Sequence, residues 1–213
     1  MLYHKIQSVF KRDPATNHKT FLEGEWSEDA FGYLAGNDWL WTEKVDGTNI
    51  RVIWDGTSVT FGGRTERAQL YAPLVNFLQD TFTAERMAEQ FPDGGAVLFG
   101  EGYGARIQKG GGNYLQDRVG LILFDVVVGP WYLRLDSVHE VANAFGVPVV
   151  PAVGVGTLYE AINYTKTGFP SFCSEVSHVA EGLVMRPLVD LFMRDGSRVI
   201  TKVKHKDFPG GTS

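Results

Sequence analysis

A pair of short apolar segments joined by an Asp-Gly turn constrains the fold of this chain more than any other feature. Residues 51–54 and 58–61 are rich in β-branched and aromatic side chains, and Asp55-Gly56 lies between them. This pattern is typical of a hairpin between antiparallel strands. Further segments of the same kind lie at residues 39–45, 96–104, 120–128, 131–135, 181–187, 191–195 and 198–206. Segments with apolar residues at helical spacing lie between some of these predicted strands, but strands and helices do not alternate regularly. The sequence therefore predicts an α+β fold with antiparallel sheets, not a doubly wound fold.

The helical signals are fewer than the strand signals. Apolar residues at helical spacing predict a helical segment between Leu70 and Phe91, and a short helix is expected over residues 137–145 with Asp136 as its N-cap. Residues 1–37 are polar and mixed, so we expect them to wrap the core without forming it. Residues 148–177 are rich in turn-forming residues, and no element is predicted there.

Composition limits the class of protein. The chain has 213 residues, of which 44% are hydrophobic and 21% charged, as in ordinary globular domains. A net charge of −5 argues against a protein that coats nucleic acid through bulk charge, although it allows a local basic groove. The single cysteine, Cys173, fits a reducing compartment. The N-terminal residues lack the apolar run of a signal peptide, so the sequence predicts a soluble, cytoplasmic protein.

Lys44 lies in a Lys-x-Asp-Gly motif within residues 43–49, at the end of a predicted strand. A lysine can act as a nucleophile if desolvation or neighbouring cations lower its usual pKa of about 10.4. The same four residues also suit a surface lysine followed by an ordinary Asp-Gly turn. The motif alone leaves both interpretations open.

Three further sets of residues suit either a binding site or an ordinary structural role. Lys202 and Lys204 share one face of a predicted strand, which suits a polyphosphate and suits equally a charged edge strand. Glu101 and Glu181 border apolar strands, where a carboxylate is costly unless it is exposed, paired or bound to a metal such as Mg²⁺. Phe124 suits either the core or a ring that stacks on a base.

Taken in order, these motifs resemble those of the covalent nucleotidyltransferases, which include polynucleotide ligases and mRNA capping enzymes. Thr48-Asn49 after the Asp-Gly and a glycine-rich loop with Ile107-Gln108-Lys109 resemble the RNA ligase 2 family in particular. The resemblance spans nearly the whole chain and rests on residues 10–13, 43–49, 62–65, 99–101, 124–125, 181–184 and 202–204. It implies an antiparallel-sheet nucleotidyltransferase (adenylation) domain, ATP-grasp-like in architecture, that occupies residues 1–213 as a single domain.

The resemblance also implies a reaction. Lys44 would attack the α-phosphate of ATP to give a lysyl–AMP, AMP would pass to a 5′-phosphate, and a 3′-OH would then displace AMP. Lys202 and Lys204 would bind the α-phosphate and lower the pKa of Lys44. For the nucleotide, the resemblance implies that Glu101 binds the ribose, that Phe124 stacks on the adenine and that Glu43 contacts the adenine edge. It also implies that Arg64 lies near the phosphates and the nick. Glu181 would engage Mg²⁺ through water, and Asn49 would help to hold metal-bound water.

The expected function is therefore an ATP- and Mg²⁺-dependent RNA ligase. Its partner would be RNA with 3′-OH and 5′-phosphate ends, in a nicked duplex, and we expect a monomer without membrane contact, in the host cytoplasm if the chain is of phage origin. Because the chain ends nine residues after Lys204, we expect a minimal form that lacks the C-terminal domain of most polynucleotide ligases. Three alternatives remain open: a DNA or other polynucleotide ligase, a GTP-using guanylyltransferase, and a non-catalytic protein that binds nucleic-acid ends.

Overall fold

The hairpin expected from residues 51–61 is present in the computed structural model of the chain, which describes residues 1–211. Strand β5 (Thr48–Trp54) pairs antiparallel with β6 (Val59–Gly62). Asp55 closes the turn between them, since its Oδ1 accepts the backbone N–H groups of Thr57 and Ser58 at 2.8 Å. The local turn chemistry that the sequence showed therefore fixes this hairpin, as predicted.

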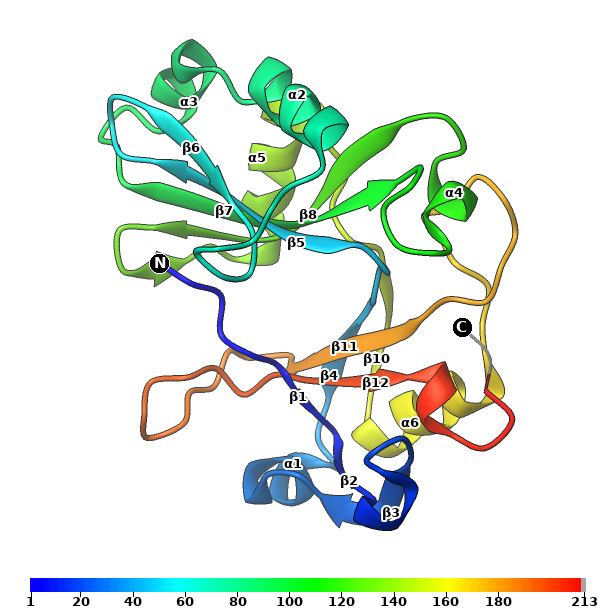
Figure 1. The fold of residues 1–213 in the computed structure, drawn as a ribbon. Coiled ribbons are helices and arrows are strands. Elements are labelled where there is room, and N and C mark those ends of the chain that lie inside the picture. The colour runs from blue at the N-terminus through cyan, green and yellow to red at the C-terminus, as the bar shows by residue number, and fades with distance from the viewer. Residues whose placement is uncertain (212–213) are drawn as a thin grey trace. The chain divides into compact units, whose positions relative to one another are not determined.

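Two compact units make up the described residues (Figure 1). Unit 1 comprises residues 1–3, 46–150 and 174–176, and unit 2 comprises residues 4–45, 151–173 and the described part of 177–213. Each unit contains one five-stranded sheet, and each is described by itself below. The assignment of the chain to a single adenylation domain stays a prediction.

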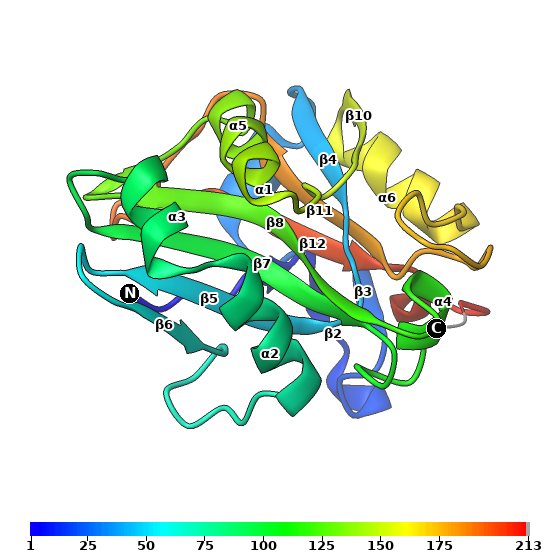
Figure 2. The same ribbon diagram turned by 90° about the horizontal axis from the view of Figure 1, so that it is seen from above.

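Unit 1 is an antiparallel sheet covered by helices. Its strand order is β6-β5-β7-β8-β9, where the last three strands are β7 (Ala96–Gly104), β8 (Val119–Val128) and β9 (Trp131–Tyr132). The strands predicted at 96–104 and 120–128 are confirmed, whereas the partner expected over 131–135 is only two residues long. Figure 2 shows helices α2 (Ala72–Thr81), α3 (Ala84–Gln90) and α5 (Leu135–Phe145) over the sheet, and a short helix α4 (Gly111–Tyr114) follows β7.

The helices of unit 1 begin and end at places that the sequence only partly predicted. The segment expected between Leu70 and Phe91 is two helices, because Thr83 caps α3 through its hydroxyl, which accepts the backbone N–H of Arg86. The assignment of Asp136 as an N-cap was wrong: α5 begins at Leu135 with Arg134 at the N-cap position. The inner faces of α2, α3 and α5 pack on apolar residues of β5, β7 and β8 to form one core.

Unit 2 has a second sheet, in the order β1-β12-β11-β4-β10. Its strands are β1 (Gln7–Ser8), β4 (Trp39–Glu43), β10 (Ala152–Gly156), β11 (Gly182–Pro187) and β12 (Thr201–Lys204), and all pairs are antiparallel except β1–β12. A hairpin of β2 (Phe10–Arg12) and β3 (Phe21–Trp26) and the helices α1 (Asp29–Leu34) and α6 (Leu158–Thr167) complete the unit. Short 3-10 turns lie at Pro14–Thr16 (η1) and His205–Asp207 (η2).

Three expectations about unit 2 were wrong. The strand expected over residues 191–195 is not formed, and only an isolated bridge between Phe192 and Arg198 is present there. Residues 1–37 do not merely wrap the core, since Val9, Phe10, Phe21 and Phe31 are buried within it. Residues 148–177 contain β10 and α6, which the sequence reading did not predict. A capping box begins α6: the Thr157 hydroxyl accepts the Glu160 N–H, and the Glu160 carboxylate accepts the Thr157 N–H.

The fold class is the expected one, a mixture of helices with antiparallel sheets. Within residues 1–211, none of the helices is both long and apolar enough to span a bilayer.

Candidate active site

Lys44 follows the last residue of β4, where the backbone is held by the neighbouring strand. Its N–H donates to the Gly182 carbonyl at 2.9 Å. Its Nζ lies 2.6 Å from Glu181 Oε2, and 19% of the side chain is exposed. The turn that follows requires glycine, because a Cβ at Gly47 would lie 2.2 Å from the Gly102 carbonyl oxygen. The Lys-x-Asp-Gly motif thus places a mostly buried amine beside a carboxylate.

Glu181 binds a second lysine with its other oxygen. Oε1 of Glu181 lies 2.5 Å from Lys204 Nζ, and only 5% of the Glu181 side chain is exposed. The antiparallel register of β11 and β12 sets this contact, since Gly182 pairs with Lys204. Glycine is needed at 182, where a Cβ would lie 2.0 Å from the Val203 carbonyl oxygen. The Glu181-Gly182 pair is therefore what lets the carboxylate reach both lysines.

Lys44, Glu181 and Lys204 form a triad, and the two lysines affect the pKa of Glu181. Burial raises the pKa of a carboxyl, but the positive charges of Lys44 and Lys204 outweigh burial and hold the pKa of Glu181 below its ordinary value. Lys202 lies two residues before Lys204 on β12 and is half-buried. The structure therefore brings three of the predicted catalytic residues into direct contact and places the fourth on the same strand.

Glu43 is buried, with 1% of the residue exposed, and its carboxylate accepts from a single turn. The hydroxyl of Ser171 donates to Oε1 at 2.5 Å, the N–H of Phe172 donates to Oε2 at 2.7 Å, and the thiol of Cys173 lies 3.3 Å from Oε1. Burial, together with the negative charge of Glu43, raises the pKa of Cys173 to about 12. The predicted contact of Glu43 with the adenine edge stays a prediction, and its contacts with residues 171–173 were missed from the sequence.

Unit 1 carries Asn49 and Glu101 side by side. These residues are direct partners across β5 and β7. The side-chain oxygen Oδ1 of Asn49 is buried and lacks a hydrogen-bond partner among the described residues. A buried amide oxygen without a donor is costly. A water or a hydroxyl from a bound molecule would satisfy it.

Phe124 lies on β8 of the same sheet, where an unpredicted residue packs against it. The ring of Tyr3 meets Phe124 edge-on at 5.1 Å and Phe99 at 4.9 Å. The Tyr3 hydroxyl donates to Asp125 Oδ2 at 2.5 Å. Phe124 is half-buried, so part of its ring surface remains accessible. No signal in the sequence indicated that Tyr3 would hold this ring, because 122 positions separate it from Asp125.

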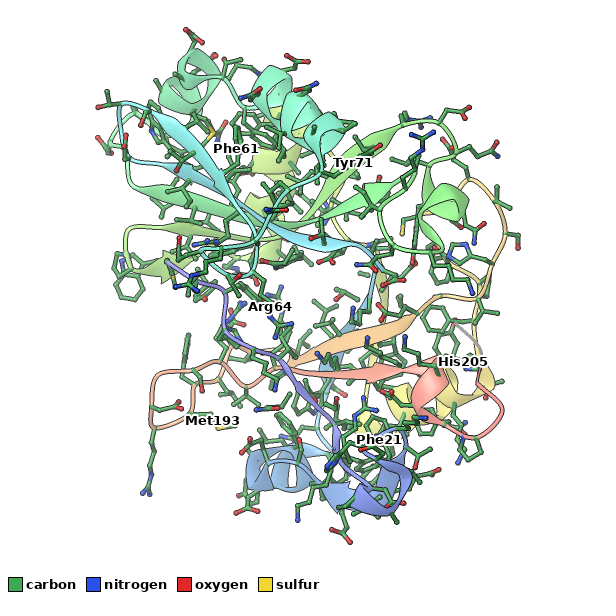
Figure 3. The ribbon with its side chains drawn as sticks, viewed as in Figure 1. Phe21, Phe61, Arg64, Tyr71, Met193 and His205 are labelled. Atoms are coloured by element: carbon green, nitrogen blue, oxygen red, sulfur yellow. The ribbon has the colours of Figure 1, made fainter. Side chains whose placement is uncertain are left out.

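Arg64 is exposed in the turn after β6 (Figure 3). A buried arginine shapes this turn: Arg51 Nε donates to the Gly63 carbonyl at 2.8 Å, and one of its terminal nitrogens lies 3.2 Å from Glu66 Oε1. Sequence reasoning missed Arg51, although a cation inside the apolar 50–54 strand was a readable signal. Arg51 thus fixes the backbone beside the predicted phosphate contact.

Each of the two predicted metal residues, considered within its own unit, suits a hydrated Mg²⁺ better than an ion held by protein alone. Among residues 1–211, no three His, Cys, Asp or Glu side chains gather into a metal-binding group. Mg²⁺ is commonly bound through one or two carboxylates together with phosphates and retained waters. Glu181 supplies a carboxylate, and the unsatisfied Asn49 oxygen can accept a hydrogen from a metal-bound water. Both residues therefore suit the roles that the resemblance implies.

Comparison with known proteins gives a consistent result. The RNA ligase family model matches residues 37–204. The structure is similar to Naegleria gruberi RNA ligase with PPi, at 20% identity and a TM-score of 0.65, covering 96% of this chain and 56% of that chain. It is also similar to variants of that ligase with ATP and Mn (18% identity, TM-score 0.66, 96% and 56%) and with AMP and Mn (19%, 0.63, 94% and 56%). This chain thus spans a little over half the length of those ligases, and at such identities the likeness shows a shared fold.

Proposed function

Because this chain belongs to the RNA ligase family, we propose that it is an ATP- and Mg²⁺-dependent RNA ligase that forms a covalent Lys44–AMP. The observation that carries this proposal is the triad in unit 2, in which Glu181 contacts Lys44 at 2.6 Å and Lys204 at 2.5 Å. The similar Naegleria gruberi ligase structures with ATP, with AMP and with PPi support the choice of nucleotide.

The proposed reaction has three steps. In the first, the Lys44 Nζ loses a proton and forms a bond to the α-phosphorus of ATP, while the bond to pyrophosphate breaks and pyrophosphate leaves. In the second, an oxygen of an RNA 5′-phosphate attacks the same phosphorus, and the phosphorus–nitrogen bond breaks to return Lys44. In the third, a 3′-OH attacks the activated 5′-phosphate and AMP leaves. The 3′–5′ phosphodiester is the product.

The triad explains how the resting protein keeps Lys44 charged. A carboxylate at 2.6 Å stabilises the ammonium form of a lysine, which is not a nucleophile. Lys44 can attack only after Glu181 has moved away from it or has been neutralised by another cation. A hydrated Mg²⁺ held by Glu181 would supply charge neutralisation at the phosphates. Lys204, released from the same carboxylate, would then be able to bind a phosphate oxygen.

The proposal also assigns roles to residues of unit 1. The half-buried ring of Phe124 would stack on the adenine, and Glu101 would bind the ribose. The Asn49 oxygen would accept a hydrogen bond from a metal-bound water, and Arg64 would contact phosphate. RNA with 3′-OH and 5′-phosphate ends in a nicked duplex is the proposed substrate, and the protein is proposed to act as a monomer. Phosphoryl transfer needs mainly positioning and charge neutralisation, and these side chains offer both.

The test is the intact mass of the protein after incubation with ATP and Mg²⁺, followed by a ligation assay. We expect a mass gain of one AMP with ATP and none with GTP. The adenylylated protein should then seal a nick whose 3′-OH strand is RNA faster than an all-DNA nick, because RNA is distinguished by its 2′-OH and A-form shape. A guanylyl adduct, or equal sealing of both nicks, would contradict the proposal.

A further inference from the structure

The side chain of Phe172 ends a column of four aromatic rings in unit 2. Trp41 and Tyr164 lie 6.4 Å apart between ring centres, Tyr164 and Phe169 4.9 Å, and Phe169 and Phe172 6.1 Å. The angles between successive ring planes are 29°, 24° and 29°, so each pair is stacked. Phe169 is buried, whereas Phe172 is 56% exposed. The column therefore begins on β4, passes α6 and ends in solvent.

The Trp41 end of the column, which is partly buried, has little freedom to move. A Cβ at Gly154 or Gly156 of β10 would lie 3.1 Å or 2.8 Å from the ring of Trp41. The Trp41 ring thus fills the space that side chains at these two positions would occupy. Phe169 is fixed as well, because its carbonyl accepts the Ala180 N–H at 2.8 Å.

The exposed end is held by a buried charge. The Phe172 N–H donates to Glu43 at 2.7 Å, and the side chains on either side of it, those of Ser171 and Cys173, contact the other oxygen of the same carboxylate. Hydrogen bonds to a charged acceptor are among the strongest that proteins make. Three of them fix the backbone on both sides of Phe172. The exposure of this ring is therefore built into the turn and is not the result of a loose loop.

We propose that Phe172 is a stacking platform for a nucleobase of the RNA substrate, next to the ends being joined. The exposed face of the last ring in a stack can pack against another flat ring. Every nucleobase has such a ring, so this contact does not depend on the RNA sequence. The adenine of ATP is assigned to Phe124, so Phe172 is left for the RNA. The partly exposed ring of Phe172 suits an RNA substrate that must bind and then be released. This inference rests on the proposed function, since it assigns a residue to the RNA that the ligase would join.

The chain itself links this platform to the reactive lysine. Glu43, which anchors the platform, is the residue immediately before Lys44. Both lie at the end of β4, which the register with β11 fixes through the pair of Glu43 and Leu183. A base on Phe172 would therefore be held by the strand end that also carries the nucleophile.

The test measures RNA affinity by fluorescence anisotropy with Mg²⁺ and without ATP. The probe is a nicked duplex with a 5′-phosphate and a 3′-OH RNA strand, together with a series that lacks one base at a time near the nick. Phe172→Ala should weaken binding of the complete duplex about tenfold, the size of one lost base stack. Phe172→Tyr keeps an aromatic ring and should bind the complete duplex with an affinity close to that of the parent. The loss from Phe172→Ala should vanish on the one duplex that already lacks the stacked base.

The matched control is Phe192→Ala, which removes an equally exposed phenylalanine (57%) from a different part of unit 2 and should leave RNA affinity unchanged. The thermal midpoint of each variant shows whether it is folded. Equal affinities of Phe172→Ala and the parent would overturn the proposal, as would a loss that persists on every base-deleted duplex. A defect in AMP attachment at limiting ATP as large as the defect in RNA affinity would also overturn it, by assigning the ring to ATP. A parent protein that never gains AMP would refute the proposed function and leave the affinity test of Phe172 valid.

Discussion

Glu181 Oε2 lies 2.6 Å from Lys44 Nζ, so the predicted nucleophile is ion-paired with the predicted magnesium ligand. The other oxygen of Glu181 holds Lys204 at 2.5 Å, and the carboxylate is nearly inaccessible to solvent. The structure therefore holds Lys44 in an ion pair, and in the proposed reaction Lys44 attacks only after Glu181 has moved away from it or has been neutralised by another cation.

Glu181→Gln should lower the free energy of unfolding at pH 7 by about 3 kcal/mol, because it leaves two partly buried lysines without their carboxylate. The pKa of Glu181 is held below its ordinary value of 4.5. A depressed carboxyl pKa stabilises the fold above that value, and this stabilisation disappears as the pH falls through the folded-state pKa. The difference between parent and Glu181→Gln should therefore shrink below about pH 4.5. Urea unfolding from pH 7 to pH 3.5 measures it.

Glu89→Gln is the control for this series, since Glu89 is exposed on α3 and should show no comparable effect at any pH. A difference between parent and Glu181→Gln that stays constant as the pH falls would mean that the ion pairs do not contribute the stability assigned to them.

Phe124→Ala should raise the ATP concentration needed for half-maximal AMP attachment by roughly tenfold, because one base stack is lost. Phe124→Tyr keeps a ring and should stay close to the parent. Since Tyr3 also packs on Phe124, the Ala variant loses some stability as well. The rate is therefore measured at limiting and at saturating ATP, where a purely structural defect affects both equally. If Ala and Tyr behave alike, Phe124 is an ordinary core residue.

Cys173 should react slowly with iodoacetamide at pH 8 in the folded protein. Its pKa is raised to about 12 by burial and by the negative charge of Glu43, so almost none of it is thiolate at this pH. An unperturbed cysteine, with a pKa near 8.5, is roughly one-quarter thiolate under the same conditions. Alkylation followed by mass spectrometry should show at least a tenfold slower reaction in buffer than in urea. Similar rates in both would indicate that the contact between Cys173 and Glu43 does not persist in solution.

Sequence patterns predicted the fold well where turn chemistry and strand period agree. The hairpin around Asp55-Gly56 and the strands at 96–104 and 120–128 are present in the structure. They could be predicted because each has enough residues to show its pattern. The core role of residues 1–37 was missed because β1 and β2 are two and three residues long, too short for any period. Helix α6 could have been found from Thr157 and Glu160, whose spacing is that of a capping box.

The candidate site was predictable as a set of residues but not as a set of contacts. Lys44, Glu181 and Lys204 were identified individually, yet their pairing depends on the register of β11 with β4 and with β12, which periodicity does not define. The anchoring of residues 171–173 by Glu43 depends on a buried carboxylate that accepts from a turn 128 positions away. Contacts of this kind appear only when the tertiary fold is known.

The intact mass of the protein after incubation with ATP and Mg²⁺ tests whether Lys44 is the nucleophile, when the parent is compared with Lys44→Ala. Lys204 remains paired with Glu181 in this variant, so we expect the fold to survive, with a thermal midpoint close to that of the parent. We expect the parent to gain the mass of one AMP, the adduct to map to Lys44, and Lys44→Ala to gain nothing. A parent that stays unmodified, or a Lys44→Ala protein that still gains AMP, would contradict this expectation.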